Sequence, residues 1–104
     1  MNVLHTTLIP NVTPILDKGV RVACSRSPLR RVWFHLRSLR GWARKHVAER
    51  HDASPGEVVH MEFEIPWHWL HRHSRGVYWC DRDVPPAHCV GVEFRPDQWG
   101  GKIS

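Results

Sequence analysis

Cysteine is scarce in this sequence of 104 residues, in which Cys24, Cys80 and Cys89 form an odd and widely spaced set. A disulfide framework needs paired cysteines in an oxidising compartment, so this set indicates a reducing compartment instead. Neither a Cys-x2-Cys pair nor a His-x3-His pair occurs, and structural zinc sites usually show such spacing. We therefore predict no metal site and expect Cys80 and Cys89 to behave as small buried hydrophobic residues.

Long apolar runs are also missing. No stretch approaches the roughly 20 apolar residues that span a bilayer. Residues 1–6 lack a basic region followed by an apolar run, so no signal peptide is predicted. With neither an internal repeat nor a low-complexity tract, residues 1–104 are expected to form a single cytoplasmic domain without a membrane partner, and the tail from 95 to 104 looks loose.

Positive charge and tryptophan are plentiful. The formal net charge is +5, with nine further histidines. This balance favours polyanions such as RNA, DNA or nucleotide phosphates, although a merely soluble basic surface would have the same composition. The six tryptophans, three phenylalanines and one tyrosine supply much of the predicted core, because each large aromatic side chain buries on the order of 150–250 Å².

Several short strands are predicted from alternation and from β-branched or aromatic residues. The clearest spans residues 59–65, where apolar side chains alternate with His60, Glu62 and Glu64 on a solvent-facing side. The two glutamates are interpreted as solvated, with acid–base chemistry as the alternative. Further extended segments are predicted at residues 2–7, 20–23, 32–35, 77–80 and 90–94.

One long helix is predicted over residues 38–50, with Leu36, Leu39, Ala43 and Val47 facing the core. Gly41 weakens this helix by roughly 1 kcal/mol relative to alanine, which suggests a close-packing role. Shorter helical pieces are expected at residues 15–18, ending at Gly19, and at residues 67–70. The basic segment 71–75 is predicted to be mobile. These elements do not alternate regularly enough for a doubly wound sheet, so the expected fold class is α+β.

Three segments, taken in order, carry a family resemblance. Residues 4–7 (Leu-His-Thr-Thr) lead into a short helix that ends at Gly19-Val20. Residues 32–35 (Val-Trp-Phe-His) run directly into the long helix. Residues 76–79 (Gly-Val-Tyr-Trp) are followed by Val-Pro-Pro at 84–86 and Val-Gly-Val at 90–92. Together they resemble the ADP-ribosyltransferase-like superfamily, in the branch of RNA 2′-phosphotransferases and related DNA-modifying toxins.

The resemblance implies a split pair of small sheets, with one main helix, gripping NAD in the cleft between them. His5 would hold the nicotinamide ribose, and Trp33 or Phe34 would stack on the nicotinamide. Fixing the ribose and stacking the leaving ring would place the reacting carbon against an acceptor in a nucleic acid or a protein. The remaining residues assigned by the resemblance are His35 in a catalytic role, Thr6, Thr7, Gly19 and Tyr78 at the cofactor, and Arg26, Arg30 or Arg31 at a phosphate.

The sequence departs from this family at one important position. Many members carry a glutamate near the penultimate strand, and none lies around Gly76-Val77-Tyr78. The chain is then a phosphotransferase-like member, an unusual transferase or a fold relative that has lost catalysis. His5 as a histidine at the edge of the core, and Trp33 or Phe34 as ordinary core residues, remain the structural alternatives.

Two functions from other classes compete with NAD-dependent transfer. A non-catalytic nucleic-acid-binding module would gather basic residues and exposed tryptophans into one stripe, and its binding would weaken steeply with salt. A small toxin or inhibitor would instead expose an apolar patch for protein contact, for example Trp67, Trp69 and Leu70.

Overall fold

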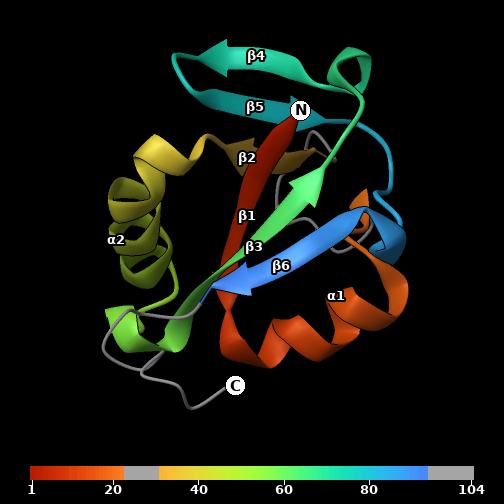
Figure 1. Cartoon of the computed structure of the whole chain (residues 1–104). Coiled ribbons are helices and arrows are strands. Elements are labelled where there is room, and N and C mark those ends of the chain that lie inside the picture. The colour runs from red at the N-terminus through yellow and green to blue at the C-terminus, as the bar shows by residue number, and fades with distance from the viewer. Residues whose placement is uncertain (23–30, 94–104) are drawn as a thin grey trace.

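The computed structural model describes residues 1–22 and 31–93, and their secondary structure is that of an α+β domain, as predicted (Figure 1). The strands are β1 (Asn2–Leu8), β2 (Val32–His35), β3 (Val58–Glu64), β4 (His71–Ser74), β5 (Val77–Cys80) and β6 (Cys89–Glu93). The α-helices are α1 (Val12–Lys18) and α2 (Arg40–Arg50). Short 3₁₀ helices cover η1 (Ile9–Asn11), η3 (Arg37–Leu39), η4 (Pro55–Glu57), η5 (Trp67–Trp69) and η6 (Pro86–His88).

Within the described residues the strands form one antiparallel sheet in the order β4-β5-β2-β1-β3-β6. β1 pairs with β3 along its whole length, from Asn2 opposite Glu64 to Leu8 opposite Val58. By contrast, β1 and β2 share a single registered pair, Leu4 opposite His35. The resemblance implied a split pair of sheets, whereas here two three-stranded halves join into one sheet at this narrow seam between β1 and β2.

The two faces of the sheet are covered differently. Side chains alternate along a strand, so Val3, Phe34 and Met61 point to one face, which we call the core face. These residues belong to the main apolar cluster, which Ile15 of α1 completes. Helix α2 packs against β1 and β3 on the opposite, α2 face, where it buries Ala43 (Figure 1). Two helices therefore cover opposite sides of the β1–β3 half.

A glycine allows a close approach at the end of α1. Gly19 has φ +82°, and a Cβ there would lie 2.1 Å from the carbonyl oxygen of Val84. Val20 and Val84 form an antiparallel bridge beside it. The segment after α1 is thereby fixed to the loop before η6, which closes the core face.

Three predictions about the fold were wrong in detail. Residues 71–75 were expected to be mobile, yet His71–Ser74 is strand β4, because β5 pairs with it and supplies its backbone partners. Gly41 was expected to allow close packing, but a Cβ there would meet nothing within 4 Å. His60 was assigned to a solvent-facing side, but its exposed fraction is 1% because it lies on the α2 face.

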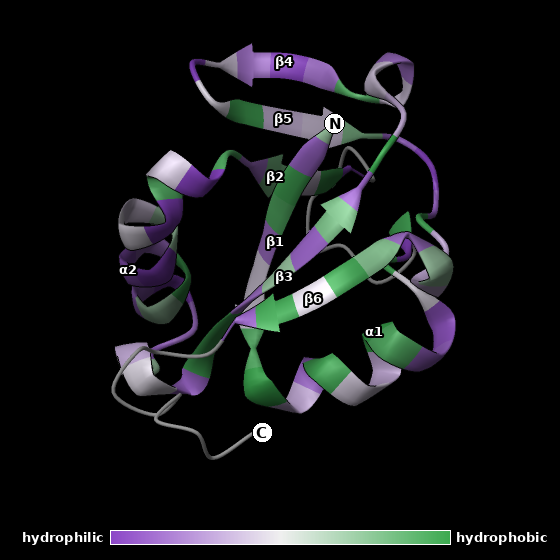
Figure 2. Ribbon diagram, in the orientation of Figure 1, coloured by the Kyte–Doolittle hydropathy of each residue, from purple (hydrophilic) through white to green (hydrophobic). Residues whose placement is uncertain are grey.

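The edges of the sheet differ in polarity. Strand β4 is hydrophilic along its length, whereas β6 at the other edge is mostly apolar (Figure 2). Charged and polar side chains protect an edge strand from pairing with other chains. No helix in the described ranges is both long and apolar enough to cross a membrane.

Candidate functional site

Strand β1 separates the residues that the resemblance assigned to it. His5 and Thr7 lie on the core face, and Thr6 lies on the α2 face, because neighbouring side chains in a strand point in opposite directions. The Nδ1 of His5 donates a hydrogen bond to the carbonyl oxygen of Trp33 at 3.0 Å. Burial lowers the pKa of His5 and the nearby His35 adds to this effect, while the bond to Trp33 opposes it. The histidine is thus neutral and joined to β2.

Of the other residues assigned to the cofactor, Phe34 contacts His5, with ring centroids 5.6 Å apart and planes 56° apart. Phe34 is 1% exposed and packs edge-on against Phe63 in the core. Trp33 points to the α2 face and is partly exposed. Tyr78 packs against the core cluster, and Gly19 lies against Val84 as described above. Arg26 and Arg30 lie outside the described residues.

Three polar side chains on the α2 face form a hydrogen-bonded network, which we call the Thr6 network. Thr6 comes from β1, His35 from β2 and His60 from β3. The Oγ1 of Thr6 lies 2.5 Å from Nε2 of His35 and 2.7 Å from Nδ1 of His60. On the other side of its ring, His35 Nδ1 lies 2.9 Å from the carbonyl oxygen of Leu36. The sequence singled out Thr6 and His35 but not His60.

The carbonyl of Leu36 determines where every proton in this network lies. A carbonyl only accepts, so His35 carries its proton on Nδ1. The Nε2 of neutral His35 is then an acceptor for the hydroxyl of Thr6. The oxygen of Thr6 accepts in turn from Nδ1–H of His60. Both rings are neutral, and Nε2 of His60 is left as an unprotonated acceptor.

That last nitrogen is buried and has no hydrogen-bond partner within the described residues. Burial is the main reason that the pKa of His60 falls to about 4. The positive charges of Arg44 and Arg40, and His35 when it is protonated, lower it further, and the carboxylate of Glu93 opposes them. Burial also lowers the pKa of His35. The surroundings therefore favour the neutral state that the hydrogen bonds require.

Ion pairs hold the start of α2 over this network. Arg37 in η3 reaches Glu62 of β3 at 2.7 Å and Glu93 of β6 at 2.5 Å. Arg40 lies 3.8 Å from the second oxygen of Glu93. The Arg37 pairs raise the pKa of its guanidinium. Glu62 is therefore a salt-bridge partner rather than a free solvated carboxylate.

A second feature lies on the α2 face of the other half of the sheet, over β2, β5 and β4. Trp33 is opposite Trp79, and Trp79 is opposite His71, so the three side chains share a face. The ring of His71 stacks on Trp79 with centroids 4.1 Å apart and planes 19° apart. The guanidinium carbon of Arg31 lies 3.8 Å from the centroid of Trp79.

The side chains of His71, Trp79 and Arg31 form a column that we call the Trp79 stack. β5 lies between β4, which carries His71, and β2, which Arg31 immediately precedes, so these two side chains approach the indole from opposite sides. Beside the stack, Trp33 and His73 meet edge to face at 5.0 Å. His71 and His73 are exposed. The result is an aromatic and basic surface that is open to solvent.

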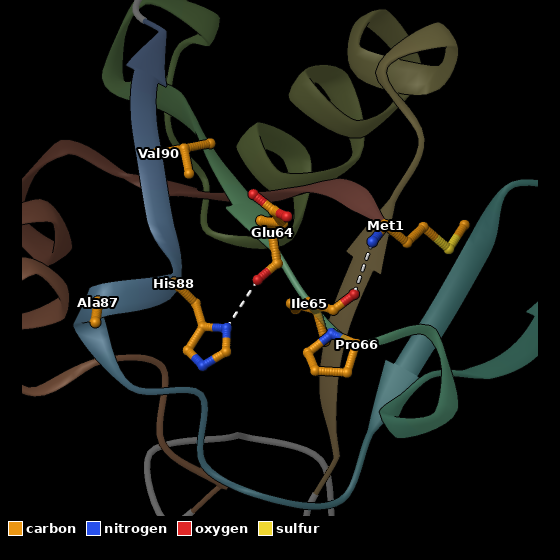
Figure 3. A pocket seen from close by; sticks show the side chains of 7 residues that line it. All are labelled: Met1, Glu64, Ile65, Pro66, Ala87, His88 and Val90. Atoms are coloured by element: carbon orange, nitrogen blue, oxygen red, sulfur yellow. Dashed lines mark hydrogen bonds between the residues drawn. The ribbon is translucent and has the colours of Figure 1, made fainter.

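Two hollows in the described surface lie away from both features. One of about 370 Å³ lies between the end of β3 and the start of β6 (Figure 3). Its polar groups are engaged, since His88 Nδ1 donates to the carbonyl oxygen of Glu64 at 2.8 Å and the amino group of Met1 to that of Ile65 at 2.9 Å. The other hollow lies beside α2 and is lined by Gly41, Arg44 and Ala53 among others.

The apolar patch expected at 67–70 is only partly open. Trp67 is 76% exposed, but Trp69 and Leu70 pack against the core cluster.

In the described part of the chain, no group of three or more His, Cys, Asp or Glu could hold a metal ion. Neither a scan against protein-family models nor a search of curated proteins found a match to this chain.

Proposed function

We propose that this chain binds single-stranded nucleic acid on the surface formed by the Trp79 stack and the Trp33–His73 pair. The observation that carries the proposal is the column of His71, Trp79 and Arg31 on one face of an antiparallel sheet. Proteins that bind single strands stack unpaired bases on aromatic side chains and attract the phosphates with nearby cations. The net charge of +5 supports the same class of ligand.

The geometry indicates where bases would stack. Both faces of Trp79 are occupied, so a base does not lie on that indole itself. It extends the column on the exposed outer face of His71, or packs on the partly exposed Trp33. Both positions are built by neighbouring strands, which lie about 4.8 Å apart and hold the rings at fixed spacing. Binding of this kind is tolerant of sequence, because every base has an aromatic face.

The test is titration of labelled single-stranded RNA and DNA oligonucleotides at low salt, followed by fluorescence anisotropy. Stacking contributes roughly 1–3 kcal/mol per base, so Trp33→Ala and His71→Ala should each weaken binding by roughly 5- to 150-fold. Trp67→Ala is the matched control, because Trp67 is exposed but lies in η5, outside this surface. It should bind as the unchanged protein does.

Two results would count against the proposal. One is the absence of saturable binding to any single strand at low salt. The other is an equal loss of affinity in Trp67→Ala and in the two variants of the stacking surface. Equal affinity in all variants, combined with a steep fall in affinity with salt, would likewise indicate attraction by overall charge alone. Circular dichroism of each variant checks that the sheet is intact.

A further inference from the structure

The seam between β1 and β2 has little backbone pairing of its own. Among the residues that the structure describes, only Leu4 and His35 are in register across it, whereas β2 pairs with β5 from Val32 to His35. Side chains supplement the backbone there. The Thr6 network connects β2 to β1 through His35 and continues to β3 through His60. The bond from His5 to the carbonyl oxygen of Trp33 crosses the same seam.

The hydrogen bonds of the Thr6 network require both imidazole rings to be neutral. If His35 gains a proton on Nε2, it no longer accepts from Thr6. If His60 gains one on Nε2, a new buried donor has no partner within the described structure. An unpartnered buried polar group costs roughly 1–3 kcal/mol, and more when it is charged. Protonation therefore acts against the contacts that close the seam.

Charged and titratable groups of α2, β2 and β6 act on the pKa of His60. From above the sheet face come Arg40 and Arg44 of α2, and Arg37 of η3 lies close to them. From the sheet come the carboxylates of Glu62 and Glu93, which are held in ion pairs with Arg37. The remaining titratable groups are His35, across the seam on β2, and His5, on the opposite face of β1. Cations predominate, so a proton on His60 adds to an existing positive charge.

We infer that the seam is a pH-sensitive joint, which acid opens by protonating the Thr6 network and so releases β2, with β5 and β4, from β1. This inference does not depend on nucleic-acid binding. The direction follows from linkage. A histidine whose pKa is lowered by folding stabilises the closed state above the pKa it has when open, and this contribution is lost as pH falls towards the pKa of the closed state.

His60 sets an upper bound on its share of the effect, reached if opening also exposes this histidine to water. Its pKa is about 4 in the closed state against 6.5 for an unperturbed imidazole. If His60 regains the unperturbed value when the seam opens, this difference makes the opening equilibrium up to roughly 20-fold more favourable between pH 7 and pH 5. His35 acts in the same direction. The measurement is hydrogen exchange of backbone amides in β2 and β3, corrected for the intrinsic exchange rate at each pH.

In the full-length chain, opening of the β2 amides should increase between pH 7 and pH 5, with up to roughly 20-fold coming from His60, and it should precede opening of the β3 amides. His60→Asn keeps a donor near the position of Nδ1 but does not titrate, so its pH dependence should be much smaller. His88→Asn is the matched control, because His88 also donates from Nδ1 to a carbonyl but lies away from the seam. It should retain the full dependence.

Equal protection of β2 at both pH values would overturn the inference, as would the same pH dependence in His60→Asn and the unchanged chain. If His60→Asn does not fold, nitrogen NMR of the unchanged chain decides. We expect His35 and His60 to carry their protons on Nδ1 at pH 7 and to protonate together with the opening of β2. A proton on Nε2 of His35 at pH 7 would refute it.

Discussion

Replacing Thr6 by valine removes one hydroxyl and preserves the shape of the side chain. That hydroxyl donates to Nε2 of His35 and accepts from Nδ1 of His60. Valine would leave Nε2 of His35 and Nδ1 of His60 without these partners. Both residues are buried, with exposed fractions of 5% for His35 and 1% for His60. Each buried unsatisfied group costs about 1–3 kcal/mol, so Thr6→Val should lower the free energy of unfolding by roughly 2–6 kcal/mol. The total free energy of unfolding of a typical domain is about 5–15 kcal/mol, so this loss is large.

The neighbouring Thr7→Val is the matched control. Thr7 is also buried, but its Oγ1 accepts only from Nδ2 of Asn11 among the bonds described, at 2.9 Å. Asn11 is exposed, so water replaces the lost partner and the cost should be below about 1 kcal/mol. Urea unfolding at pH 7.5, followed by tryptophan fluorescence, gives both values. Thr6→Ser, which restores the hydroxyl, should recover most of the loss.

The reasoning fails if Thr6→Val and Thr7→Val differ by less than about 0.5 kcal/mol, which is the usual range for a substitution without a specific mechanism. It also fails if Thr6→Ser is no more stable than Thr6→Val, because the loss would then come from packing. Unchanged denaturant slopes in the three variants are required for the comparison, since a changed slope indicates a different denatured state.

Three further predictions concern single positions. Gly41→Ala should raise stability by up to about 1 kcal/mol, because a Cβ there meets nothing and alanine favours the helix; a lower melting temperature would contradict this. Gly19→Ala should prevent folding or cost several kcal/mol, because its Cβ would overlap the carbonyl of Val84 and φ is +82°; a soluble variant of unchanged melting temperature would refute it. NAD-dependent transfer stays a separate prediction: under it, titration calorimetry shows saturable NAD binding that His5→Ala abolishes, and no heat at millimolar NAD discards it.

Much of the secondary structure could be predicted because its signals are local. Alternation between residues 59 and 65 predicted β3, found at Val58–Glu64. The helix expected over 38–50 is present as η3 followed by α2 at Arg40–Arg50. Strand β4 was missed because none of its residues is apolar. It forms since Gly76, with φ +78°, lets the chain turn and pair with β5. Such pairing is a tertiary effect that no pattern within residues 71–75 contains.

The site was only partly predictable for a similar reason. Thr6, His35 and Trp33 were singled out individually, but their partners were not. Thr6 meets His60 because β1 and β3 place them opposite each other in register. His60 alternates with apolar neighbours, as a solvent-facing residue would. It is nevertheless buried, because α2 packs on the face of the sheet to which it points. Residue type and spacing along one segment do not reveal which strand lies beside it.

Strand β2 connects the two features of this molecule. Trp33 and His35 lie two residues apart on it and point to the same face, one towards the stacking surface and one into the Thr6 network. A ligand held by Trp33 and a proton taken up by His35 therefore act on the same four residues. Coupling between two binding events is reciprocal. If acid opening of the seam weakens the binding of single-stranded nucleic acid, then bound nucleic acid must weaken protonation of the Thr6 network by the same factor. The histidine titration of the complex would then report ligand binding without any contact between ligand and histidine.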